Sequence, residues 1–590
     1  MYRAPVSEIG FTLRQVAGLG EAMAAGTAGD LTPDLLAAIL DEAGRFAESE
    51  IAPLAAAGDR IGAVWRDGAV TMPPGWRDLY HRWTDGGWNG LTGPVDHGGQ
   101  GLPTSLSAAI YEMWNGASMA FGIGPTLTLG AVDALEAHGT EALRATYLDK
   151  LVSGEWMGTM NLTEPQAGSD LSALRTRAER RDDGTYRIFG SKIFITFGEH
   201  DLTDNIVHLV LARLADAPAG VKGISLFLVP KRLVNADGTL GARNDVFCQS
   251  IEHKLGIHAS PTCTMVYGDG VGETGEAGAV GWLVGQENQG LACMFTMMNS
   301  ARLYVGIQGL GVAQAAFQKA LDFARERRQG RSSVKGATDM APIVEHADVA
   351  RMLLTMKALV GSARAIAYSC GHAIDRSRQG GEDKRFWAER ASLLTPMAKS
   401  FPTDVGVEVA SLGIQVHGGM GFVEETGAAR LLRDARIAPI YEGTNGIQAI
   451  DLVTRKLPLS GGETVRAFIA ELEEIALAVE RSNRPDFGRT ADRLHNAIAA
   501  LREATERLLE WTAKGETSHA LAGATAYQRL FSLTVGNCYL AKGALADLDD
   551  PARTALAHFM AETLLPDVHA LTAQVLEGGE SLRSATIALN

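Results

Sequence analysis

A block of short β-type segments interrupts an otherwise helical chain, and this order constrains the fold more than any other feature. Within residues 155–284, runs such as TYRIFGSKIFITFG and GISLFLVPKRL are rich in Ile, Val, Phe and Thr and are separated by Gly, Asp and Pro turns. They predict six to eight strands in a barrel or sandwich. On both sides of the block, apolar residues recur at helical spacing. We therefore predict a mainly α protein with a central β domain.

Composition shifts divide the chain into five predicted regions. They are an N-terminal extension (1–30), a helical domain (31–155), the β domain (156–285), a helical bundle (286–457) and a C-terminal helical extension (458–590) that opens with the PLSGG break. Thr32 followed by Pro33 marks the start of the first long helix. Threonine suits the residue that caps a helix N-terminus, and proline suits the first helical position.

Charge and composition exclude several classes of protein. The 590 residues carry 54 Lys+Arg and 69 Asp+Glu, a net charge of −15, which argues against a nucleic-acid or anionic membrane partner. No run reaches the roughly 18 uninterrupted apolar residues of a membrane span, the nearest being residues 294–317, and the first residues lack the apolar core of a signal peptide. Five widely spaced cysteines predict reduced, buried side chains, no metal site and a cytoplasmic location.

The usual nucleotide-binding motifs are missing. No G-x-G-x-x-G follows a strand and opens a helix, and no Walker A sequence is present. Any nucleotide must therefore be held by loops of the β domain and by helix termini.

Three short clusters could carry chemistry. LTEPQAGSD (162–170) could bind an anion or a heterocycle edge, or be an ordinary Pro/Gly turn. QVHGGMGF (415–422) allows close backbone approach, or is a helix stop. IYEGTNGIQ (440–448) places Glu442 after an apolar run, where desolvation would raise its pKa toward that of a general base. Alternatively, Glu442 is a solvated turn carboxylate or a carboxylate at the start of a helix.

Taken together, in this order and spacing, the three clusters resemble the acyl-CoA dehydrogenase family over residues 31–456. That family has a helical domain, a β domain and a helical bundle. YRAP (2–5), GEHD (198–201), LGIH (255–258) and the extra C-terminal helices resemble its extended branch. This branch contains 3-methylmercaptopropionyl-CoA dehydrogenases and broad-specificity fatty acyl-CoA dehydrogenases.

The resemblance implies a catalytic base and substrate contacts. Glu442 matches the residue that removes the α-proton of the acyl thioester, and Ala301 leaves the family's alternative base position empty. The implied substrate-binding residues are Ser169, Asn299, Arg302, Tyr441, Glu442 and Gly443. Asn299 stands where the family commonly has aspartate, so a charge near the expected CoA passage is lost.

The resemblance also implies FAD as cofactor and a homodimer. The implied contacts of one subunit with FAD are Leu162, Thr163, Ser169, Phe194, Ile195 and Thr196. Arg327, Gln415, Gly418 and Gly419 match residues that a neighbouring subunit brings to the same FAD, and Thr444 matches a position in that region. The C-terminal helices would then cover a surface that shorter relatives use to form tetramers.

The implied reaction is dehydrogenation of an acyl-CoA to trans-2-enoyl-CoA, with electron transfer flavoprotein as acceptor. The expected substrate is 3-methylmercaptopropionyl-CoA or a similar short- or medium-chain acyl-CoA. The alternatives are a broad-specificity medium- or long-chain dehydrogenase, a related flavoprotein oxidase, and a catalytically silent flavoprotein of the same fold.

Overall fold

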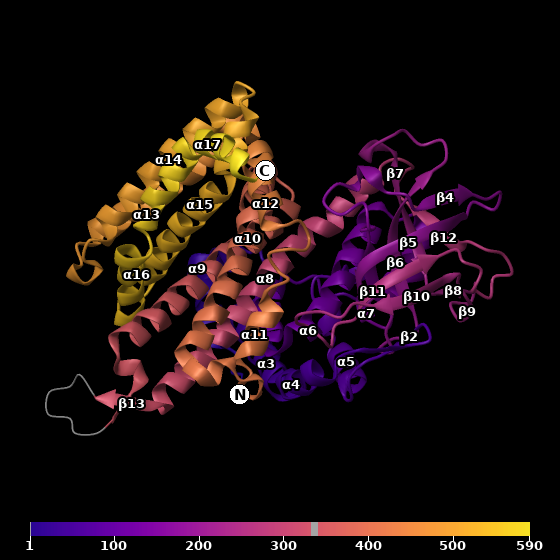
Figure 1. Ribbon diagram of the computed structural model, residues 1–590, viewed down its shortest axis with the longest axis horizontal. Helices are drawn as coiled ribbons and strands as arrows, with labels where there is room; N and C mark the ends of the chain where they lie inside the picture. Colours follow the sequence, from indigo (N-terminus) through magenta and orange to yellow (C-terminus); the bar gives the residue numbers. More distant parts are fainter. Residues whose placement is uncertain (1, 332–339, 590) are drawn as a thin grey trace. The chain divides into compact units, whose positions relative to one another are not determined.

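The computed structural model describes residues 2–331 and 340–589, apart from the side chain of Asn299. Its contacts divide the chain into two compact units (Figure 1). The helical unit comprises Met1–Glu48, Pro103–Ala117 and Arg302–Asn590, and the sheet unit comprises Ser49–Leu102 and Ser118–Ala301.

The helical unit is built from long helices. Its helices are α1 (Val6–Phe11), α2 (Leu19–Ala24), α3 (Pro33–Phe46), the first part of α6 (Thr104–His138), most of α8 (Gly290–Glu326), α9 (Ala347–Arg378), α10 (Lys384–His417), α11 (Ala428–Ala435), α12 (Asn445–Asp451), α13 (Glu463–Ser482), α14 (Thr490–Ala513), α15 (Thr517–Ala546), α16 (Pro551–Thr563) and α17 (Asp567–Ala585). A small hairpin pairs β13 (Arg328–Arg331) with β14 (Met340–Pro342). The predicted start of α3 is confirmed, since Thr32 Oγ1 accepts a hydrogen bond from the Leu35 N–H at 3.2 Å.

The sheet unit contains one eight-stranded sheet together with α4 (Ala52–Ile61), α5 (Trp76–Asp85), α7 (Glu141–Ser153) and the second part of α6. The sheet follows the order β10-β11-β5-β12-β7-β6-β3, and β4 pairs with β5 and β6. Its strands are β3 (Met157–Asn161), β4 (Arg177–Arg180), β5 (Tyr186–Thr196), β6 (Ile206–Leu214), β7 (Ile224–Pro230), β10 (Val246–Ile251), β11 (Thr262–Tyr267) and β12 (Ala279–Val284). Two short hairpins pair β1 (Val64–Arg66) with β2 (Ala69–Thr71) and β8 (Arg232–Val234) with β9 (Leu240–Arg243). The predicted fold class, mainly α with a central β domain, is confirmed.

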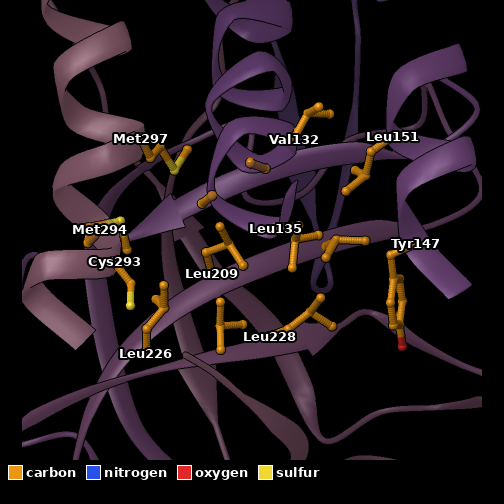
Figure 2. Packing of buried hydrophobic residues seen from close by; sticks show 14 of the residues in the cluster. Val132, Leu135, Tyr147, Leu151, Leu209, Leu226, Leu228, Cys293, Met294 and Met297 are labelled. Carbon is orange, nitrogen blue, oxygen red and sulfur yellow. The ribbon is translucent and has the colours of Figure 1, made fainter. Parts of the chain in front are cut away.

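The core of the sheet unit lies between one face of this sheet and helices α6 and α7. Leu209 and Leu228 project from neighbouring strands toward Leu135 and Leu151, and Met297 closes one end (Figure 2). All five side chains are buried. Burial of a large aliphatic side chain contributes about 1.5–3 kcal/mol, so this packing holds β6, the strand with which β3 pairs.

Helix α6 is long and apolar enough to span a membrane by length and composition, and it is the single such helix among the described residues. This corrects the expectation that residues 294–317 come nearest to a span. In its most apolar window 89% of the residues are buried inside the protein, and Ser118 interrupts it with an extended backbone (φ −158°, ψ 106°). Core helices of this kind pass the same test. The five cysteines are free and buried, as predicted.

Candidate functional site

Glu442 lies in the loop between α11 and α12, with its backbone in the left-handed region (φ 56°). This conformation is unfavourable for a residue with a side chain, and it persists only where the surroundings enforce it. Gly443 follows with φ 83°, and Thr444 then caps α12, because its Oγ1 accepts a hydrogen bond from the Ile447 N–H at 3.1 Å. The loop therefore has two consecutive residues with positive φ directly before the capped start of α12, which fixes the backbone at Glu442.

The surroundings of Glu442 bring the pKa of its carboxyl close to neutral pH. Desolvation raises the pKa of the Glu442 carboxyl to about 7, although attraction to Arg302 and Lys399 acts in the opposite direction. A carboxylate with a pKa in this range can exist unprotonated at neutral pH and still bind a proton strongly. Glu442 is half-buried, and the desolvation that raises its pKa distinguishes it from a fully solvated turn carboxylate.

Arg302 is buried in α8 and carries its charge beside a buried acid. Its Nη1 lies 4.0 Å from Asp451 Oδ2, at the end of α12, and Asp451 also pairs with Arg455 and with Lys456. Desolvation lowers the pKa of the Arg302 guanidinium, whereas Asp451 and Glu442 favour its charged form. Positive charges thus outnumber the acid that they surround.

Tyr441 and Gln448 fix the loop on either side of Glu442. The Tyr441 hydroxyl donates a hydrogen bond to Oε1 of Gln308, a buried residue of α8. The Gln448 amide, at 3.5 Å, approaches the Glu442 carbonyl. The sequence-predicted residues Arg302, Tyr441, Glu442, Gly443 and Thr444 therefore come together in the helical unit.

In the sheet unit, the loop that follows β3 is held from beneath by a buried ion pair. Lys192 Nζ lies 2.8 Å from Glu164 Oε1 and donates a hydrogen bond to the Leu162 carbonyl at 3.0 Å. Glu164 also accepts hydrogen bonds from the Thr176 hydroxyl (2.6 Å) and from the Arg175 N–H (2.8 Å). These bonds fix Leu162 and leave Ser169 exposed on the outer part of the loop.

The end of β5 presents an aromatic side chain to solvent. Phe194 is 59% exposed and has a left-handed backbone (φ 61°), whereas the neighbouring Ile195 is buried and Thr196 is half-buried. The Ile193 N–H donates a hydrogen bond to the Thr163 carbonyl at 2.9 Å, so the loop and the strand end are joined. Leu162, Thr163, Phe194, Ile195 and Thr196 therefore form one region, with polar groups beside an exposed ring.

The remaining predicted residues lie at several places. Gln415 is exposed on the last turn of α10, and Gly418 and Gly419 follow it at an exposed helix end, where Gly418 has φ 59°. Arg327 is exposed directly after α8. The side chain of Asn299 lies outside the described residues.

Four residues near these positions escaped the sequence analysis: Lys192, Gln308, Lys399 and Asp451. Each is a polar residue inside an apolar stretch and each is at least 97% buried. A polar residue inside an apolar stretch was the only sequence feature that could have indicated these four positions. Glu199, in the GEHD segment, is also buried and pairs with Lys231 and Arg243. Among the described residues, no group of His, Cys, Asp or Glu side chains is placed to hold a metal ion.

Comparison with known proteins identifies similar domains and similar full-length proteins. Models of the acyl-CoA dehydrogenase N-terminal, middle and C-terminal domains match residues 34–155, 159–269 and 288–457, and a model described as acetyl-CoA dehydrogenase C-terminal like matches 463–586. The 3-methylmercaptopropionyl-CoA dehydrogenase of Ruegeria pomeroyi is 46% identical, over 99% of this chain and all of that protein. A butyryl-CoA dehydrogenase of Syntrophomonas wolfei is 35% identical, over 86% of this chain and 84% of that protein.

Solved structures share the fold. An acyl-CoA dehydrogenase from Bacillus anthracis, complexed with FAD, superposes with a TM-score of 0.73 at 21% identity, covering 95% of this chain and 91% of that one. The matched domains cover most of the sequence, and the full-length relative exceeds 30% identity. The chain therefore belongs to the acyl-CoA dehydrogenase family and is an enzyme of that family.

Proposed function

We propose that this enzyme uses FAD to dehydrogenate 3-methylmercaptopropionyl-CoA, or a similar short acyl-CoA, to the trans-2-enoyl thioester. Glu442 removes the α-proton, and the β-hydrogen leaves with its electron pair as hydride. One C–H bond breaks at each carbon and a double bond forms between them. Bound FAD supplies the acceptor for the hydride.

The observation that carries this proposal is the state of Glu442. Its left-handed backbone and the capped helix that follows fix the chain position from which the carboxylate projects. Desolvation brings its pKa to about 7, which matches the requirement for a general base at neutral pH. The positive side chain of Arg302, directed by Asp451, favours negative charge near the base, and an enolate-like transition state is negatively charged.

The residues of the sheet unit fit a flavin. The exposed ring of Phe194 offers an apolar contact for a planar ring system. Thr163, Thr196 and Ser169 add hydroxyl groups to the same region, at positions that are not buried. We propose that these residues, with Leu162 and Ile195, bind FAD along its ring and pyrophosphate.

The choice of substrate is supported by the full-length relative from Ruegeria pomeroyi. A broad-specificity linear acyl-CoA dehydrogenase of Mycobacterium tuberculosis is 33% identical over 80% of this chain, a weaker support for the alternative. A pocket discriminates one methylene by only about 1–3 kcal/mol, so the assay must compare acyl chains directly.

We propose further that the enzyme is a cytoplasmic homodimer that passes electrons to electron transfer flavoprotein. Arg327, Gln415, Gly418 and Gly419, the residues expected to meet the cofactor of a neighbouring subunit, are all exposed. A single dimer peak in light scattering is the expected result, and a stable tetramer at low concentration would contradict it.

An anaerobic spectral titration tests the function. The purified wild-type protein should lose its flavin absorbance near about 450 nm on addition of 3-methylmercaptopropionyl-CoA, and less completely with butyryl- or octanoyl-CoA. Glu442→Gln, which keeps the shape of the side chain, should retain flavin and remain oxidised. If flavin is bound but no acyl-CoA reduces it, the protein is a silent flavoprotein. If octanoyl-CoA is preferred, the broad-specificity alternative is correct.

A further inference from the structure

Lys399 is a fully buried lysine in the middle of α10. Its Nζ donates hydrogen bonds to two neutral acceptors, the Ala438 carbonyl at 2.9 Å and Asn445 Oδ1 at 2.8 Å. Burial of an ammonium group is costly unless the group is well solvated by protein. A lysine at such a position therefore needs a reason beyond packing.

Its two acceptors lie at opposite ends of the loop that carries Glu442. Ala438 precedes the loop, and Asn445 is the first residue of α12. The Asn445 amide also binds α10, because it donates to the Ser400 carbonyl at 3.2 Å and to Asp404 Oδ1 at 2.7 Å. The ends of the loop are thus tied to each other and to one helix.

Lys399 also places a positive charge near Glu442. Among the groups that act on Lys399, desolvation lowers its pKa to about 7, while Glu442 and Asp404 favour its charged form and Arg302 disfavours it. The same desolvation raises the pKa of Glu442. Each group therefore stabilises the charged form of the other.

The remaining charges near this pair belong to the helices around it. Arg302 from α8 also acts on Glu442, and it is itself paired with Asp451 at the end of α12. Arg455 and Lys456 complete the group around Asp451.

We propose that Lys399 is a positioning residue for Glu442, which ties both ends of the loop to α10 and sets a positive charge beside the carboxylate. The charge part rests on the proposed role of Glu442 as the base. The loop part rests only on the two hydrogen bonds, and it can be tested without substrate.

Two variants separate the two parts. Lys399→Met keeps a flexible apolar stem one atom shorter than lysine but removes both donor and charge, and Lys399→Gln, also one atom shorter, keeps an N–H donor without the charge. Lys542→Met is the matched control, because Lys542 also donates to a carbonyl, that of Val16 at 2.9 Å, at a separate place in the helical unit.

Hydrogen exchange measured by mass spectrometry on the holoenzyme tests the loop. Amides of residues 438–449 should exchange about tenfold faster in Lys399→Met than in the wild type, as expected when hydrogen bonds that hold a loop are lost. Lys399→Gln should exchange at a rate nearer the wild type, and Lys542→Met should leave this segment unchanged. Wild-type exchange in Lys399→Met would overturn the loop part. If Lys399→Met does not fold, as judged by circular dichroism, Lys399→Gln is compared with the wild type. Its side chain is one atom shorter than lysine, so both bonds should weaken and the segment should exchange about threefold faster; exchange equal to that of the wild type would overturn the loop part.

The pH dependence of flavin reduction tests the charge. Loss of a nearby positive charge makes the carboxylate harder to ionise, so the acidic limb of the rate profile should move up by about one pH unit in both Lys399 variants. A merely structural lysine would slow the reaction without moving the limb, and that result would overturn the charge part. If wild-type flavin is never reduced, the proposed function fails while the exchange result still judges the loop.

Discussion

The buried ion pair of Lys192 and Glu164 should add little to the free energy of unfolding, whereas removal of one partner alone should lower that free energy strongly. Folding lowers the pKa of Glu164 from 4.5 to about 2, which stabilises the folded state by about 3 kcal/mol at neutral pH, since one pKa unit is about 1.4 kcal/mol. Folding also lowers the pKa of Lys192 from 10.5 to about 8. That shift opposes folding by a similar amount at neutral pH. The attraction between the two charges contributes to both shifts, so the pair as a whole adds no net stability.

Single substitutions remove this balance. Glu164→Gln leaves the ammonium of Lys192, which is fully buried, with the Leu162 carbonyl as its remaining strong acceptor, and we expect a loss of about 3–5 kcal/mol. Lys192→Met should cost less, about 2 kcal/mol, because the Thr176 hydroxyl and N–H still solvate the carboxylate. The double variant should lie within about 1 kcal/mol of the wild type.

Urea unfolding followed by circular dichroism measures all four proteins. The pH dependence has a defined sign: the contribution of Glu164 is complete above pH 4.5 and is lost as the pH falls toward 2, whereas the cost at Lys192 is complete below pH 8 and is relieved as the pH rises toward 10.5. Additive losses in the double variant would refute the reasoning. So would single losses below about 0.5 kcal/mol.

Three further predictions concern the helical unit. The rate of flavin reduction should rise with pH through about 7 and then level off, because Glu442 must lose its proton before it can act as a base; a rate that is flat between about pH 5 and 9 would contradict this. Gly306→Ala would place a Cβ 1.8 Å from the Ala398 carbonyl oxygen and should cost at least about 1–3 kcal/mol in thermal unfolding. Gly578→Ala, with no atom within 4 Å, should instead gain about 0.5–1 kcal/mol. Thr444→Val should lose about 1 kcal/mol with the cap of α12, and Thr444→Ser should restore it.

The order of helical and β segments could be predicted from the sequence because it depends on local periodicity. Apolar residues repeat at helical spacing over many turns in segments such as α14, and they gather in short runs in β6 and β7. Capping is local as well, which is why the Thr32-Pro33 start of α3 was readable. The hairpins β1–β2 and β13–β14 lie inside regions predicted as helical and were not predicted, because strands of three or four residues leave too short a pattern to detect.

The supports of the candidate site could not be predicted in the same way. Lys192 pairs with a glutamate 28 residues away, and Lys399 bonds residues 39 and 46 positions away. Periodicity carries no information about such partners. The left-handed backbone of Glu442 could not be predicted either. Gly443 indicates a turn, but a glutamate rarely adopts a positive φ, so its sequence position gives no such indication. The loop acquires this conformation from the contacts of its ends.

Both candidate regions use a buried lysine to hold a loop, and the difference between the two lysines indicates their roles. Lys192 forms a direct ion pair with Glu164 at 2.8 Å, so the positive charge of Lys192 is balanced beneath the loop. Lys399 bonds only neutral oxygens of Ala438 and Asn445 among its described hydrogen bonds, so its charge, which is present below its pKa of about 7, acts on Glu442. A base that must ionise despite desolvation gains from such a charge, whereas a loop that only has to keep its shape does not. This is why the two lysines should respond differently to loss of charge: the pH profile should move at Lys399, and stability should fall at Lys192.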